Sequence, residues 1–237
     1  MTAVRATRPD DVLPQGERKY REVQAMFDRI APRYDHVNRV ISLGQDRRWR
    51  RRTVTALQLA PGACVLDVAC GTGDLCNDLA AAGHRPVGVD FSAGMLAAAH
   101  TRAPLVRGDA LHLPVPDGAV DGIVTGFALR NFVDLEGFLL ECARALRPGG
   151  RLSALDAAEP EHALLRAGHR RRGRCAGTRG RGRLGHDADA YHYLPRSTAY
   201  LPAPRDLVAL LERVGFAAVG RVTFTAGAVQ LLTGTRA

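Results

Sequence analysis

A glycine turn behind a short apolar segment is the part of this sequence whose residue types and spacing favour chemistry. Residues 64–69 form an apolar run that predicts a buried strand, and Gly71, Thr72 and Gly73 follow it before a predicted helix. A strand, a glycine turn and a helix in this order form a nucleotide site in a doubly wound sheet. Asp90 stands 19 residues after Gly71, at the end of the next predicted strand, where a carboxylate binds ribose hydroxyls.

The residues around the turn discriminate between nucleotides. A dinucleotide site needs a small residue three positions after the second glycine, and Cys76 stands there. Asp74 follows the turn directly, and its carboxylate disfavours a phosphate anion but suits a ligand with a positive end. S-adenosylmethionine is such a ligand, because it carries a ribose, an ammonium and a sulfonium. A turn without any ligand is the alternative, but carboxylates at or near the ends of several strands favour a ligand: Asp67, Asp74, Asp90 and Asp109.

The elements that must position these residues alternate between strand and helix. Helices are predicted over 17–30, 46–57, 75–82, 92–100, 134–146 and 205–214, and strands over 64–69, 86–90, 105–109, 120–126 and 151–155. Residues 217–225 and 228–235 predict a closing antiparallel pair. We therefore expect an α/β fold with a doubly wound, mostly parallel seven-stranded sheet. Pro32 predicts the end of the first helix, and the Arg-Pro-Gly-Gly sequence at 147–150 the end of the fifth.

One segment interrupts this regular order. Residues 1–16 predict a mobile leader and 17–237 a single domain, but 166–185 within it is rich in arginine and glycine. A local shift of reading frame in a GC-rich gene is the first hypothesis, and a real RNA-binding insert is the second. The formal net charge of +9 comes mostly from this segment, so it is weak evidence for a nucleic-acid partner.

Several motifs give the sequence a more specific resemblance. Residues 65–74 read Val-Leu-Asp-Val-Ala-Cys-Gly-Thr-Gly-Asp and resemble motif I of the class I S-adenosylmethionine-dependent methyltransferases. Within that class the sequence resembles the demethylmenaquinone and ubiquinone C-methyltransferases, the UbiE/MenG family. The stretches that carry this resemblance are Tyr34-Asp35 with Asn38, Ser-Leu-Gly to Trp-Arg at 42–50, Leu-Arg-Asn at 129–131, 146–152, and Asp-Ala-Tyr-His-Tyr-Leu at 189–194 with Ser197.

The resemblance implies a set of cofactor contacts around the glycine turn and the strand ends. The expected residues are Asp67, Gly71, Thr72, Gly73, Asp90, Asp109, Ala110 and Gly126. Asp90 would bind the ribose, and Asp109 with Ala110 would lie beside the adenine. The family often has a serine at position 126, so Gly126 leaves only its backbone for a contact there.

The resemblance also implies the reaction, which methylates a ring carbon of a prenylated quinol, demethylmenaquinol giving menaquinol. The ring carbon becomes nucleophilic when the neighbouring hydroxyl ionises, so the site needs a base or a water relay and a cation beside the phenolate. Arg130 is the candidate cation, Asn131 would orient the ring or a relay water, and Tyr191 with Tyr193 would wall the quinol pocket. For Arg130 the alternative is a solvated loop charge. Alternative substrates are another small aromatic or natural product, methylated on carbon or oxygen, and RNA.

The remaining features concern location and partners. The cysteines form no CxxC pair, so we expect no metal site. The sequence has no secretory signal and no apolar stretch of spanning length, so we expect a cytoplasmic protein. The basic run at 47–52 predicts a solvated helix face or a contact with anionic lipid headgroups at the inner face of the membrane. Nucleic acid is not expected as a partner, because the residues after the fourth strand lack the signature of methylation on base amines.

Overall fold

The structure is a computed structural model that describes residues 14–160 and 197–237. The arginine- and glycine-rich segment 166–185, Tyr191, Tyr193 and most of the predicted leader lie outside the described residues. The division of the chain into a leader and one domain therefore stays a prediction.

Seven strands form one sheet. They are β1 (Cys64–Val68), β2 (Arg85–Asp90), β3 (Leu105–Arg107), β4 (Val120–Gly126), β5 (Leu146–Ala157), β6 (Phe216–Phe224) and β7 (Val229–Arg236), in the order β3-β2-β1-β4-β5-β7-β6. The first five strands pair in parallel, and β7 is antiparallel to both β5 and β6. The predicted doubly wound sheet with an antiparallel C-terminal hairpin is thereby confirmed.

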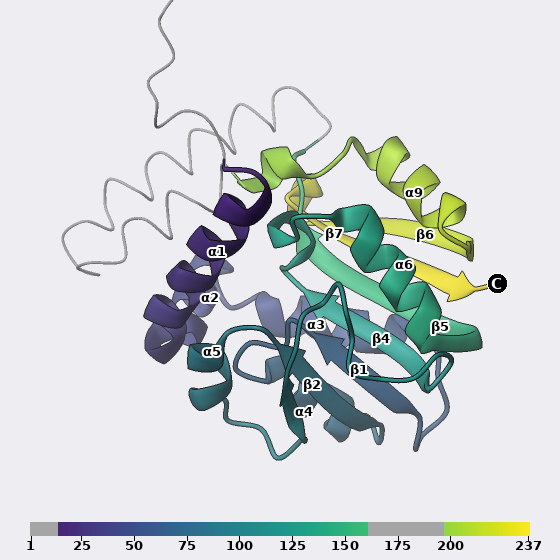
Figure 1. The fold of residues 1–237 in the computed structure, drawn as a ribbon, viewed down its shortest axis with the longest axis horizontal. Helices are drawn as coiled ribbons and strands as arrows, with labels where there is room; N and C mark the ends of the chain where they lie inside the picture. The colour runs from purple at the N-terminus through teal and green to yellow at the C-terminus, as the bar shows by residue number, and fades with distance from the viewer. Residues whose placement is uncertain (1–13, 161–196) are drawn as a thin grey trace, which may run out of the picture.

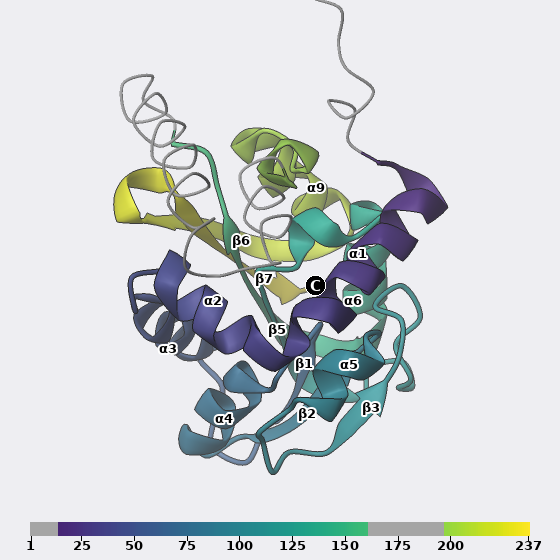
Figure 2. The ribbon, with the colours of Figure 1, turned by 90° about the vertical axis from the view of Figure 1, so that its left-hand side faces the viewer.

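Helices cover both faces of the sheet (Figures 1 and 2). On one face, α3 (Asp46–Ala56) and α4 (Asp74–Ala81) pack over Val65 and Val124. On the other, α6 (Leu135–Ala145) and α9 (Pro204–Arg213) pack over Leu66 and Ile123. Neighbouring strand residues point to opposite faces, so the continuous apolar runs of β1 and β4 supply both cores.

Two N-terminal helices lie beyond the carboxyl ends of the parallel strands (Figure 2). They are α1 (Gly16–Ile30) and α2 (Tyr34–Ile41), and a 3₁₀ turn over Ala31–Arg33 joins them. The predicted end of the first helix is confirmed, but sequence reasoning missed α2. Pro32 occupies the first turn of the next helical segment, where its missing N–H breaks no hydrogen bond.

Local signals set the ends of the other helices. Ser92 caps α5 (Ala93–Ala97) and Asp134 caps α6, each by accepting a hydrogen bond from a backbone N–H in the first turn. α6 ends at Ala145, one residue before the predicted end. The next strand begins earlier than predicted, at Leu146, because Leu146 already pairs with Val120 and the pairing then shifts register.

Substitution of Phe138 by alanine should lower the free energy of unfolding by about 3–5 kcal/mol, because the cavity left in a close-packed core cannot collapse fully. Phe138 is fully buried between α6 and the sheet and stacks on Phe132 with ring centroids 4.1 Å apart. Urea denaturation of the whole chain measures the change. Leu140→Ala is the matched control: this side chain, on the same helix, is 51% exposed, and its loss should cost less than about 0.5 kcal/mol. Equal losses in both variants would contradict the placement of Phe138 in the core.

Candidate active site

A cavity opens at the carboxyl ends of β1, β2 and β4, beneath α1 and α2. The empty space of the cavity together with its open mouth is about 780 Å³. Five predicted cofactor residues line the side toward the strands: Gly71, Asp90, Asp109, Ala110 and Gly126. Side chains from the helices line the opposite side: Tyr20, Val23, Phe27 and Tyr34. Ligands of doubly wound sheets bind at this edge, where the strand order reverses between β1 and β4.

The glycine turn has a backbone that other residues adopt with strain. Gly71 and Gly73 have φ of +55° and +88°, in the left-handed region. A Cβ on Gly73 would lie 2.6 Å from Cγ2 of Thr101, so no side chain fits there. Gly71 lines the cavity, whereas Gly73 caps α4 behind the wall. The turn therefore presents bare backbone to the cavity at Gly71.

Asp90 ties the glycine turn to the end of β2. Its Oδ2 accepts a hydrogen bond from the Gly71 N–H at 2.7 Å, and its Oδ1 accepts one from the Ser92 N–H at 2.9 Å. Burial raises the pKa of Asp90, and these two N–H groups oppose the rise. A carboxylate oxygen can accept more than one hydrogen bond, so Asp90 can hold the turn and still bind ribose hydroxyls in the cavity.

The cavity wall fits S-adenosylmethionine by its charge. Asp90 and Asp109 are the two charged side chains among the described residues of the wall, and none of those residues is basic. Oδ1 of Asp109 accepts from the Leu111 N–H at 2.9 Å, which fixes this second carboxylate. Two carboxylates and no cation suit a ligand that carries an ammonium and a sulfonium and no phosphate. At Gly126 a Cβ would lie 2.9 Å from Cδ1 of Leu75, so the wall has backbone only at that point.

Two predicted cofactor residues lie behind the cavity wall. Asp67 is fully buried, its Oδ2 accepts from the Cys76 thiol at 3.3 Å, and its Oδ1 has no partner among the described residues. Burial raises the pKa of Asp67 to about 7. Thr72 is also buried, and its hydroxyl donates to Oδ1 of Asp35 on α2 at 2.6 Å. Whether either residue contacts the cofactor stays a prediction, since both support the turn from behind.

Asp74 does not face the cavity. One of its carboxylate oxygens lies 2.9 Å from a guanidinium nitrogen of Arg50, and the other lies 3.3 Å from Nε2 of His100. The interpretation of Asp74 as the partner of a cationic ligand is therefore wrong. Its place in the first turn of α4 directs it toward α3, where Arg50 is its counterion.

Arg130 and Asn131 converge on one backbone carbonyl. Arg130 is 3% exposed, does not line the cavity, and pairs with Asp156 at the end of β5. It also donates to Oγ of Ser197 at 3.0 Å and to the Phe127 carbonyl at 2.8 Å. Asn131 lines the cavity and donates to the same carbonyl at 3.3 Å. These contacts hold Phe127 at a φ of +60°, so Arg130 supports the cavity wall, and its contact with a phenolate stays a prediction.

Sequence reasoning missed the aromatic side of the cavity. Tyr20, Phe27 and Tyr34 come from α1 and α2, and Phe91 and Phe132 come from loops after β2 and β4. Burial raises the pKa of the Tyr34 hydroxyl. The helical spacing of Val23 and Phe27 predicts burial but does not distinguish a core from a cavity wall. The Tyr34-Asp35 pair was the available signal.

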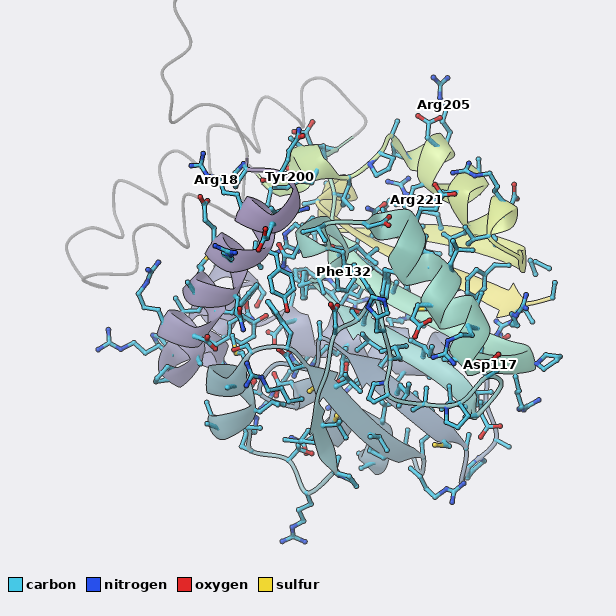
Figure 3. The ribbon with its side chains drawn as sticks, viewed as in Figure 1. Arg18, Asp117, Phe132, Tyr200, Arg205 and Arg221 are labelled. Atoms are coloured by element: carbon cyan, nitrogen blue, oxygen red, sulfur yellow. The ribbon has the colours of Figure 1, made fainter. Side chains whose placement is uncertain are left out.

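Lys19 fastens α1 over the cavity. Its ammonium donates to the Phe132 carbonyl at 2.6 Å and lies 3.8 Å from the ring centre of Tyr200, next to α1 (Figure 3). The Tyr200 hydroxyl in turn donates to the Pro14 carbonyl at 2.6 Å. Burial lowers the pKa of Lys19 to about 8.

The comparison with protein families decides to which family the chain belongs. The sequence profile of the ubiE/COQ5 methyltransferase family matches residues 15–236. The chain belongs to this family. Membership confirms the predicted family, an S-adenosylmethionine-dependent methyltransferase, and agrees with the charge of the cavity wall.

Named relatives cover almost the whole chain. A demethylmenaquinone methyltransferase of Mycolicibacterium gilvum is 42% identical over 221 residues, which span 93% of this chain and 97% of the relative. One from a Roseiflexus species is 39% identical over 234 residues, 95% of this chain and 98% of the relative.

Solved structures support the fold. A methyltransferase of Thermotoga maritima, described as a possible histamine N-methyltransferase, has a TM-score of 0.60 at 18% identity and covers 90% of this chain and 99% of its own. An S-adenosylmethionine-dependent methyltransferase of Aquifex aeolicus has a TM-score of 0.57 at 18% identity, with 79% and 89% covered.

Asp90→Asn should weaken cofactor binding by about tenfold to a hundredfold, because an amide would turn a donor toward a backbone N–H and remove an acceptor from the cavity. Calorimetric titration with S-adenosylhomocysteine measures the dissociation constant. Asp206→Asn is the matched control, because Asp206 is exposed on α9 and contacts its neighbour Arg205. A dissociation constant within about twofold of wild type for Asp90→Asn would contradict the role of Asp90.

The stability of the protein should depend on the ionisation of Asp67. Its pKa rises from 3.8 to about 7 on folding, so the folded protein binds the proton more tightly than the unfolded chain. The free energy of unfolding contributed by Asp67 therefore falls as the pH rises from 3.8 to about 7 and then stays level. In Asp67→Asn this dependence is absent. The difference in the free energy of unfolding between the variant and wild type should therefore change by about 4 kcal/mol across that range.

Urea denaturation from below pH 3.8 to above pH 7 measures the effect, and Asp121→Asn is a control of opposite sign whose window lies below pH 3.8. The side chain of Arg147 and the N–H of Cys64 lower the pKa of Asp121 by hydrogen bonding. Below pH 3.8, Asp121→Asn should therefore lose stability relative to wild type as the pH rises, whereas Asp67→Asn should gain it between pH 3.8 and about 7. Parallel curves for wild type and Asp67→Asn would rule out a raised pKa at Asp67.

Proposed function

We propose that this protein transfers the methyl group of S-adenosylmethionine to a ring carbon of a prenylated quinol, converting demethylmenaquinol to menaquinol. The cavity supports this proposal because its two sides differ in chemistry. The side toward the strands has two carboxylates for a cationic cofactor, and the opposite side has aromatic and apolar side chains suited to a quinol. The names of the relatives support the same substrate.

The cofactor, when bound, supplies a methyl group on a sulfonium to a nucleophilic carbon. Asp90, Asp109 and the backbone at Gly71 would hold it at the strand ends. Tyr20, Phe27 and Phe132 would enclose the ring and exclude water, which favours the alignment of the reacting atoms. No residue of the wall needs to act as a nucleophile, because the substrate carbon is the nucleophile.

The Leu129–Asn131 turn would position the quinol. Asn131 contacts the cavity, and its amide is oriented by the Phe127 carbonyl. Arg130 acts in our proposal as a positioning residue, which holds Phe127 and Asn131 from behind the wall. Tyr191, outside the described residues, is retained in the proposal as a wall of the quinol pocket.

A prenylated quinol resides in a bilayer, so the proposal includes peripheral contact with the inner face of the membrane by a cytoplasmic protein. Among the described residues, no helix is long and apolar enough to cross a membrane. The substrate must therefore reach the cavity from a bilayer that the described helices do not span.

Labelled S-adenosylmethionine tests the reaction with reduced demethylmenaquinone, an unrelated small phenol and structured RNA as parallel acceptors. We expect label in the quinol ring. Asn131→Ala should lower kcat by about tenfold to a hundredfold with little change in cofactor affinity, because misplacement of the ring costs alignment. Asn77→Ala on α4, outside the cavity wall, is the matched control and should keep wild-type turnover. Label in RNA or in the phenol alone would overturn the proposal.

A further inference from the structure

The arginine run of α3 divides into one inward and four outward side chains. Arg50 is 13% exposed and forms ion pairs with Asp46, Asp74 and Asp78 at 2.6 to 2.9 Å. The outward arginines are exposed, and their guanidinium groups form no hydrogen bond or ion pair with any described residue: Arg47, Arg48, Arg51 and Arg52. Charge balance within the fold therefore explains Arg50 but not the other four.

These four arginines share one face of the helix. They stand at positions i, i+1, i+4 and i+5, and the opposite face buries Asp46, Trp49 and Thr53. Between positions 42 and 57 the sequence has a single acidic residue, Asp46, which is buried and paired with Arg50. The outward face thus carries four positive charges with no acidic side chain of its own helix beside them.

An exposed leucine lies at the amino end of this face. Leu43 is 73% exposed, more than any other large apolar side chain among the described residues. Its φ of +53° is in the left-handed region, where a leucine is strained. Two hydrogen bonds of 2.9 Å hold this turn, from Gly44 N–H to the Arg39 carbonyl and from the Ser42 hydroxyl to Asp46. The fold therefore keeps an apolar side chain in solvent in the turn that precedes the arginines of α3.

The basic face lies close to the cavity. The ring of Trp49, on the buried side of α3, lies 6.2 Å from the ring of Phe127, and Phe127 lines the cavity. One helix thickness, about 10 Å, therefore separates the arginines from this part of the wall. Figure 2 shows α3 at the outer edge of the molecule, next to α2.

We propose that the outward face of α3, together with Leu43, docks the protein on an anionic lipid bilayer. Guanidinium groups bind lipid phosphates by charge-assisted hydrogen bonds, and a neighbouring leucine can insert among the acyl chains. Single-stranded nucleic acid would require exposed aromatic side chains for base stacking, and Trp49, the aromatic residue of this helix, is buried. The proposal rests on the proposed function in one respect: docking would give the cavity access to a substrate that is dissolved in lipid.

Vesicle co-sedimentation of the full chain tests the docking surface, with phosphatidylcholine alone and with phosphatidylglycerol added. Wild type should bind the anionic vesicles and not the neutral ones. The quadruple variant Arg47→Gln, Arg48→Gln, Arg51→Gln, Arg52→Gln should bind about tenfold more weakly or worse, because each arginine near the surface adds to the attraction. Leu43→Gly should also weaken binding, and glycine accepts the left-handed backbone, so the fold should be retained.

The matched control removes four exposed arginines of the described fold outside α3: Arg102→Gln, Arg107→Gln, Arg205→Gln, Arg213→Gln. It changes the net charge equally and should leave vesicle binding near wild type. Undiminished binding by the α3 variant, an equal loss in the control, or tighter binding of wild type to structured RNA than to anionic vesicles would overturn the proposal. Circular dichroism and cofactor titration verify that the α3 variant is folded.

Methylation of a short-tailed, water-soluble quinol separates this proposal from the proposed function. The α3 variant should methylate it at the wild-type rate and lose turnover on vesicle-borne demethylmenaquinol. Wild type that binds anionic vesicles but methylates no quinol would refute the proposed function and leave the docking surface standing. Equal turnover of wild type and the α3 variant on the vesicle-borne substrate would refute the docking surface.

Discussion

The buried ion pair between Arg130 and Asp156 is the interaction on which the cavity wall depends. Both side chains are almost completely removed from water, so each needs the other and further hydrogen bonds to offset desolvation. Asp156 accepts from the Arg130 N–H as well, and Arg130 donates to Ser197 and Phe127. The pair therefore joins the end of β5, the turn after β4 and the chain that follows the undescribed segment.

Several features follow from this pair. It holds Phe127 in a left-handed conformation, and Phe127 both lines the cavity and packs its ring against Trp49 of α3. A similar connection exists at the glycine turn, where Asp74 joins α4 to Arg50 of α3 and Thr72 joins the turn to Asp35 of α2. Polar contacts also hold the two N-terminal helices beside the cavity, α2 through Asp35 to Thr72 and α1 through Lys19 to the Phe132 carbonyl.

Much of the fold could be predicted from local signals, and the errors have physical reasons. The apolar run of β1, the glycines after it and the caps Ser92 and Asp134 act within a few residues, so sequence reasoning found them. α2 was missed because a proline that ends one helix can also begin another.

The sequence alone could not identify ion-pair partners that lie far apart along the chain. Asp74 stands next to the glycine turn in sequence, yet its partner Arg50 lies on a different helix. The counterion of Arg130 is Asp156, which lies 26 residues further along the chain. The sequence therefore allows a solvated loop arginine, whereas in the fold Arg130 forms a buried ion pair. The strand-end residues Asp90, Asp109 and Gly126 line the cavity, because the edge of a parallel sheet gathers them, and their contact with the cofactor stays a prediction.

Lys19 has a consequence that depends on its being the single lysine of the sequence. Its amine is buried between the Phe132 carbonyl and the Tyr200 ring, so a soluble acylating reagent reaches it only when α1 separates from the rest of the site. The rate at which this one side chain is acylated therefore reports how often α1 separates and the cavity opens. Mass spectrometry can follow the reaction without a labelling site introduced by mutation.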